Sequence, residues 1–204
     1  MRCIDGTSGR GAAVERWEDV EGFLLEMAEE DITATGELTP CLVAFAGEVP
    51  LFLAFLRPFA RGAHADPLIE LLALAMPLGA NRLAVSVAGR AWSLDDPLPP
   101  VVEGVGDLRQ QVVCIHTADG AVAEPRLDGL VRPYTLHDGA PQWEGELRPG
   151  PAQGWIPETL LAAVTSAGEL EVAPEDLVAQ AQRCVTLGHQ LYLAPAGDAM
   201  LPAS

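Results

Sequence analysis

Residues 61–76, which read RGAHADPLIELLALAM, decide how the elements around them are arranged. Asp66 stands at a typical N-cap position, and Pro67 follows it at the first helical position. Residues 68–76 then contain Glu70 as their single polar side chain, before a proline and a glycine end the run. A helix that is apolar on nearly all sides lies inside a protein. We therefore predict a buried central helix that Asp66 caps.

Helical and strand patterns alternate on both sides of this segment. From Val14 to about Glu30, apolar residues recur at three- and four-residue spacing, which predicts an amphipathic helix. Its other side carries Glu15, Glu18, Asp19, Glu26, Glu29 and Glu30. We expect that side to be solvated, with docking of a basic partner as the alternative.

The remaining segments predict a sheet. Two runs that are apolar on both faces, 41–46 and 51–56, predict a β-hairpin that is covered on each side and lies near the sheet centre. Further strands are expected at 82–92, at 109–117 and within 121–136, a long loop or exposed hairpin at 137–155, helices at 157–166 and 174–187, and a strand at 190–195.

This order predicts the α+β class. We expect a single domain with a mixed, largely antiparallel sheet, packed by the central buried helix and the N-terminal amphipathic helix. The domain is expected to span residues 13–195, with a more weakly defined part at 137–195. Residues 1–12 and 196–204 are expected to be flexible ends.

The charge of the chain restricts its partners. The formal net charge is −17, and all 12 basic residues are arginine. The absence of lysine excludes P-loop, protein-kinase and Schiff-base sites. An acidic surface repels phosphate backbones and anionic lipids, so we expect neither nucleic acid nor a membrane as partner. Lysine-free, arginine-rich usage indicates a GC-rich bacterial genome, and no apolar signal core occurs in residues 1–21, which favours the cytoplasm.

The four cysteines predict free thiols. Cys3, Cys41, Cys114 and Cys184 lie far apart and form no C-x-x-C pair. Zinc ribbons and dithiol redox sites need such pairs. We therefore expect buried thiols, no metal site and no cofactor.

The order helix, hairpin, helix and strand over residues 14–92 resembles the zinc nucleoside and base deaminases, across under half of the chain. The zinc site of that family uses H-x-E at the helix start and P-C-x-x-C after the following strand. Here the first motif is His64-Ala65-Asp66, and residues 89–100 contain no cysteine. Two of the three expected zinc ligands are absent, so the resemblance implies topology without zinc chemistry.

His64, Asp66 and His116 are the candidates for catalysis. His64 could act as a general base oriented by Asp66, but residues two apart at a helix entrance do not reliably face each other, so a helix cap is favoured for Asp66. His116 follows Cys114 by two residues on one predicted strand, which places both on one face, roughly 7 Å apart. A thiol and an imidazole in one pocket is one interpretation; a core histidine bonded to backbone is favoured.

Arginines and tryptophans are the candidates for binding. Arg57 and Arg61, together with Arg82 and Arg90, bracket the hairpin, the central helix and the next strand, where they could converge on an anion; pairing with the chain's own acids is favoured. Trp92, Trp143 and Trp155 are expected in loops, where aromatic residues can anchor a protein interface or seal the core edge.

The sequence thus favours an acidic cytoplasmic module that binds another protein, or a second copy of itself, and has no catalytic activity. The alternative is an enzyme or a small-anion-binding protein. Its pocket would lie at the N-terminal mouth of the central helix and use His64, Asp66, Arg57 and His116.

Overall fold

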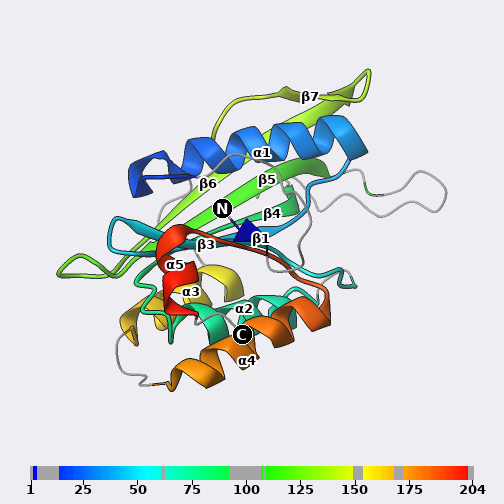
Figure 1. The fold of residues 1–204 in the computed structure, drawn as a ribbon. Helices are drawn as coiled ribbons and strands as arrows, with labels where there is room; N and C mark the ends of the chain where they lie inside the picture. The colour runs from blue at the N-terminus through cyan, green and yellow to red at the C-terminus, as the bar shows by residue number, and fades with distance from the viewer. Residues whose placement is uncertain are drawn as a thin grey trace.

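An antiparallel sheet separates two helical layers in the computed structural model (Figure 1). The structure describes residues 2–3, 14–60, 63–91, 107, 109–148, 154–167 and 172–201. Within these residues eight strands run in the order β1-β8-β3-β2-β4-β5-β6-β7, and each neighbouring pair is antiparallel. The α+β class and the largely antiparallel sheet are confirmed. The strands are β1 (Arg2–Cys3), β2 (Cys41–Ala46), β3 (Val49–Phe55), β4 (Arg82–Ala91), β5 (Gln110–Asp119), β6 (Arg126–His137), β7 (Ala140–Trp143) and β8 (Gln190–Leu193).

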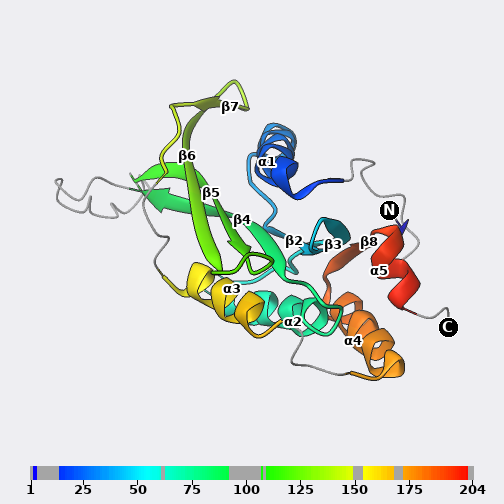
Figure 2. The same cartoon turned by 90° about the vertical axis from the view of Figure 1, so that its left-hand side faces the viewer.

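The helices are divided unequally between the two faces of the sheet (Figure 2). One face carries the short turn η1 (Trp17–Asp19) and helix α1 (Val20–Thr35). The opposite face carries α2 (Ala65–Ala75), α3 (Trp155–Thr165) and α4 (Pro174–Leu187), and the short α5 (Pro195–Met200) packs against β3. None of the helices in the described residues has the length and apolar character that crossing a bilayer requires.

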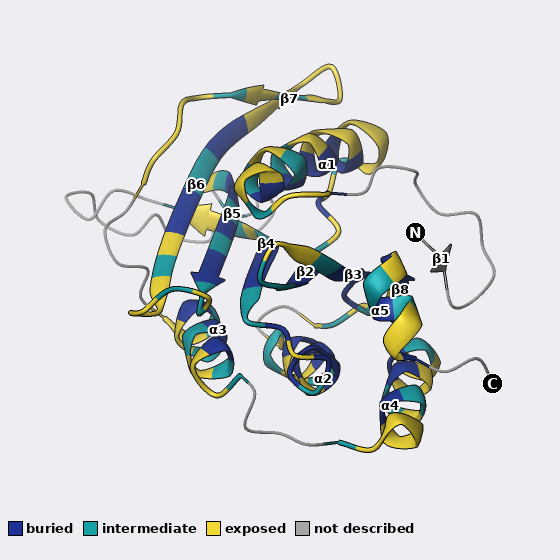
Figure 3. Cartoon of the chain, turned by 60° about the vertical axis from the view of Figure 1, so that its left-hand side comes forward, coloured by how far each residue is buried: buried dark blue, intermediate teal, exposed yellow. Residues whose placement is uncertain are grey.

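The central strand β2 is buried along almost its whole length (Figure 3), and its alternating side chains supply both cores. On β2, Leu42 and Ala44 belong to the core under α2, whereas Val43 and Phe45 belong to the core under α1. Successive side chains of a strand point to opposite faces, so only a strand that is apolar at every position can serve both cores. The expected central hairpin is therefore confirmed, with β2 lying between β3 and β4.

Helix α1 has the predicted amphipathic pattern. Its inward side buries Val20, Leu24 and Ala28, and Trp17 in the preceding turn packs edge to face against Phe45 at 5.6 Å between ring centroids. The six acids assigned to the outer side are all exposed: Glu15, Glu18, Asp19, Glu26, Glu29 and Glu30.

Helix α2 is buried as predicted, but it begins earlier than expected. Its N-cap residue is His64, and no side chain caps its amides. Asp66 is exposed and lies inside the first helical turn. An N-cap side chain bonds the next amides from an extended backbone, which a helical residue lacks. The prediction that Asp66 caps the helix is therefore wrong, although its charge still suits the positive end of the helix dipole.

The segment after β6 forms a hairpin and not a plain loop. Asp138 and Gly139 make the turn with positive φ of 51° and 83°. The turn leads into β7, which pairs with the end of β6 and contacts α1. Residues 149–153 of the expected loop lie outside the described residues.

The ends of the chain add two elements that the sequence pattern did not predict. β1 pairs with β8, which is thus the second strand from this edge of the sheet. Helix α5 begins at Pro195, continues into the segment 196–204 that was expected to be a flexible end, and packs against β3. The domain boundaries themselves stay predictions.

Candidate functional site

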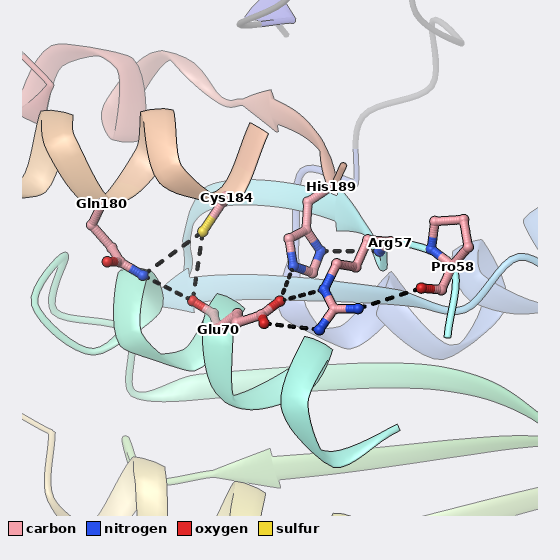
Figure 4. Close-up of polar contacts among 6 residues, drawn as sticks. All are labelled: Arg57, Pro58, Glu70, Gln180, Cys184 and His189. Carbon is pink, nitrogen blue, oxygen red and sulfur yellow. Dashed lines mark hydrogen bonds and ion pairs between the residues drawn. The ribbon is translucent and has the colours of Figure 1, made fainter. Parts of the chain in front are cut away.

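The densest polar cluster in the described residues centres on Glu70 of α2 (Figure 4). Arg57, just after β3, donates from Nε and Nη2 to the two carboxylate oxygens of Glu70, at 2.8 and 2.9 Å. Nε2 of His189 lies 2.8 Å from Oε2 of the same carboxylate. The backbone oxygen of Glu70 accepts from Gln180 and Cys184 of α4, at 3.2 and 3.5 Å. One residue therefore joins α2 to the end of β3, to α4 and to the start of β8.

His189 is held in one tautomer. Its side chain is 0% exposed, and its Nδ1 accepts the backbone N–H of Arg57 at 3.1 Å. A neutral imidazole has one donor and one acceptor nitrogen, so the ring proton sits on Nε2 and is donated to Glu70. Both nitrogens are thus engaged inside the protein. A general base needs a nitrogen within reach of a substrate proton, so this histidine and its carboxylate form a structural clamp.

Sequence reasoning missed this clamp, although one signal was present. Glu70 is the single polar residue in an apolar helical run, and a charge among buried residues needs a partner. Arg57 was named as a candidate for binding an anion, and the anion is the chain's own carboxylate. Nothing in the local pattern pointed to His189, because its two partners lie 119 and 132 positions away along the chain.

The clamp predicts a pH dependence of stability. Hydrogen bonds from Arg57, with His189 adding to them, lower the pKa of Glu70 from about 4.5 to about 2. A carboxyl group whose pKa is lower in the folded state stabilises the protein at pH values above its unfolded pKa, and that contribution is lost as the pH falls through the folded pKa.

We expect the free energy of unfolding of wild type to be higher than that of Glu70→Gln, by a margin that stays constant near neutral pH. The margin should shrink as the pH falls from about 4.5 to about 2. Urea unfolding of both proteins from neutral pH to about pH 3 measures it; a margin that does not change with pH would contradict the assignment.

The histidine at the mouth of α2 has a different neighbour from the one expected. The His64 ring packs edge to face against Trp155 of α3, at 5.5 Å between centroids. Asp66 is exposed, and no hydrogen bond or ion pair joins it to His64 within the described residues. Trp155 is 38% exposed. The structure therefore brings together His64, a candidate for catalysis, and Trp155, a candidate for binding.

His116 and Cys114 lie on β5, in the positions expected of a shared strand face. Burial lowers the pKa of His116, and burial raises the pKa of the Cys114 thiol to about 11. A nucleophilic cysteine needs a lowered pKa, so this thiol lacks the usual activation. Nδ1 of His116 is buried and has no hydrogen-bond partner within the described residues, so the expected backbone bond to this nitrogen is not seen there.

Most of the candidate arginines bind groups of the chain itself. Arg82 donates from Nε to Asp119 at 2.9 Å and also pairs with Glu48, while Arg90 donates to the backbone oxygen of Arg109 at 3.0 Å. Arg57 is bound to Glu70. These contacts agree with the expectation that the arginines bind groups of the chain itself, and no two of Arg57, Arg82 and Arg90 converge on one group. Arg61 and Trp92 lie outside the described residues.

Trp143 packs against α1. Its indole N–H donates to Glu29 at 3.1 Å, and the Arg132 guanidinium lies 4.8 Å from its ring centroid. Tyr134 adds an edge-to-face contact at 5.6 Å. These contacts attach the β6–β7 hairpin to α1, as expected of a tryptophan that seals a core edge.

The exposed side of α1 is hollowed and acidic. We call the six residues Glu15, Glu18, Asp19, Glu26, Glu29 and Glu30 the acidic face. Two hollows of about 560 and 600 Å³ follow it, and each of the six acids lines at least one of them. Phe23 and Ala34 add apolar atoms to their walls. Arg16 pairs with Glu18 and Asp19, but Glu26 and Glu30 make no ion pair with any described residue.

The acids do not gather as metal ligands. Within the described ranges no group of three histidine, cysteine or acidic side chains could hold a metal ion.

Cys41 and Cys184 are buried free thiols, and burial raises their pKa to about 12 and about 11. Comparison with protein families, with curated proteins and with solved structures finds no match to this chain.

Proposed function

We propose that this protein is a non-catalytic binding domain of the cytoplasm that takes up a basic segment of another protein on its acidic face. The observation that carries the proposal is the contrast between the arginines and these acids. Described arginines such as Arg57 and Arg82 are used inside the fold, whereas Glu26 and Glu30 face solvent without an ion pair among the described residues.

Charge and shape support a protein partner over a small cation. A row of exposed carboxylates, of which Glu26 and Glu30 have no ion pair with a described residue, creates a negative potential that attracts and orients a basic surface. The hollows also present apolar atoms of Phe23 and Ala34, which an amphipathic segment can cover. The alternative, a small-anion site at the mouth of α2, loses its expected cation, because Arg57 is bound to Glu70.

A pair of charge-matched variants tests the proposal. Glu26→Gln/Glu29→Gln/Glu30→Gln removes three acids from the acidic face, and Glu124→Gln/Asp128→Asn/Glu175→Gln removes three exposed acids elsewhere. The probe is a fluorescent helical peptide of lysine and leucine. We expect the first variant to bind it about tenfold more weakly than wild type at low salt, and the second to stay within about twofold.

Fluorescence anisotropy at low and high salt gives both affinities. The loss should shrink at high salt because screening weakens exposed charges. Equal losses in the two variants would show that net charge alone attracts the peptide, and the acidic face would then have no special role.

A further inference from the structure

The hollow at the start of α1 contains a glycine that packing inside the fold does not explain. Gly22 is exposed, lies within α1 and lines the hollow of about 560 Å³. A Cβ added there would meet nothing within 4 Å, and its φ is not positive. Glycine within a helix lowers stability relative to alanine. What Gly22 provides is a floor of the hollow that is open down to the backbone.

An aromatic ring and a carboxylate stand beside this floor. Phe23 lines the hollow, and its partly buried ring packs against the core under α1. Glu26 also lines it, is exposed and makes no ion pair with any residue that the structure describes. Residues four apart lie on the same side of a helix, so Glu26 is the next side chain along the stripe that contains Gly22. The hollow therefore combines an open floor, an aromatic wall and an available carboxylate.

Arginines of the chain itself show how the carboxylates around this hollow are bound. Arg148, 127 positions from Glu21, donates from Nη1 and Nη2 to its two oxygens, at 3.5 and 2.9 Å. Arg16 donates from Nε and Nη2 to the two oxygens of Asp19, at 2.8 and 3.1 Å. A guanidinium forms such forks because its donors are fixed in one plane, and it also stacks on aromatic rings. An ammonium group has no fork of this kind.

We propose that this hollow holds an arginine of the partner protein, whose stem lies over Gly22 while its guanidinium stacks on Phe23 and forks onto the carboxylate of Glu26. The inference rests on the proposed binding function and adds which side chain the partner presents. Negative charge attracts lysine and arginine alike. The fork and the aromatic wall favour arginine, because both contacts need a planar group with several donors.

Two peptides and a matched pair of variants test this inference. One peptide is the fluorescent helix of lysine and leucine, and the other has arginine in place of every lysine. Gly22→Gln fills the hollow with a neutral side chain that favours the helix, and Ala179→Gln makes an exposed glutamine on α4. We expect wild type and Ala179→Gln to bind the arginine peptide about fivefold more tightly than the lysine peptide. Gly22→Gln should bind both peptides equally.

Fluorescence anisotropy measures the four affinities that decide the result, and circular dichroism checks that Gly22→Gln is folded. Glu26→Gln should also remove the preference for arginine, because the fork loses its charged acceptor. Equal affinity of wild type for both peptides, or a preference that persists in Gly22→Gln, would overturn the arginine site and leave the acidic face as a binding surface. Binding of neither peptide to wild type would overturn the proposed function itself, so the two failures are distinguishable.

Discussion

Replacing Glu70 by alanine is expected to lower the free energy of unfolding by about 2–3 kcal/mol. The change removes the acceptor for the Nε2 proton of His189, whose side chain is 0% exposed and which has no access to water as a substitute. A buried donor left without a partner costs its full desolvation energy. It also removes the carboxylate that holds Arg57.

Two further variants isolate the cause. Glu70→Gln retains a side-chain oxygen that can accept from His189, so it should destabilise less than alanine. Glu175→Ala removes an exposed acid from another helix and should change stability by no more than about 0.5 kcal/mol. Urea unfolding followed by circular dichroism measures all three. If Glu70→Ala stays within about 0.5 kcal/mol of wild type, the cluster does not hold α2, α4 and β8 together.

Replacing Gly197 by alanine is the second change with a large expected effect. Helix α5 crosses β3 so closely that a Cβ at position 197 would lie 2.2 Å from the backbone oxygen of Leu51 and 3.0 Å from its carbonyl carbon. Backbone atoms of a buried strand cannot move aside as a flexible side chain can, so α5 must shift instead. We expect a loss of about 2–3 kcal/mol, typical of forced overpacking.

Gly22 provides the matched control. It lies within α1, and a Cβ added there meets nothing within 4 Å. Alanine has the higher helix propensity, so Gly22→Ala should raise stability by about 0.5–1 kcal/mol. Thermal unfolding of both variants compares the same chemical change at two positions. Equal shifts would show that the close approach of α5 does not constrain the fold.

Local patterns were enough to predict most of the secondary structure. The spacing of apolar residues located α1 and its exposed acids, and two apolar runs located the central hairpin. Pro174 and Gly188 marked the two ends of α4 as the structure has them. These features depend on residues a few positions apart, and such neighbours fix helix and strand periodicity wherever the chain is placed.

The candidate site was predicted less well. The alternative prediction placed four residues in one pocket at the N-terminal end of the central helix: Arg57, His64, Asp66 and His116. In the structure they have different neighbours. His64 meets Trp155 from a helix far along the chain, and Asp66 faces solvent. Side chains of neighbouring residues diverge or converge according to where a helix begins, and a shift of two residues at the start of α2, from Asp66 to His64 as N-cap, was enough to remove the predicted cap.

The sequence by itself determined the α+β class, the two-sided burial of β2 and the negative charge along α1, because composition and periodicity carry those properties directly. Only the tertiary structure decided that Glu70 meets Arg57 and His189, that β1 covers β8, and that α5 packs on β3. Each of these contacts joins segments separated along the chain, and their pairing depends on which surfaces the folded sheet and helices bring within hydrogen-bonding or van der Waals distance.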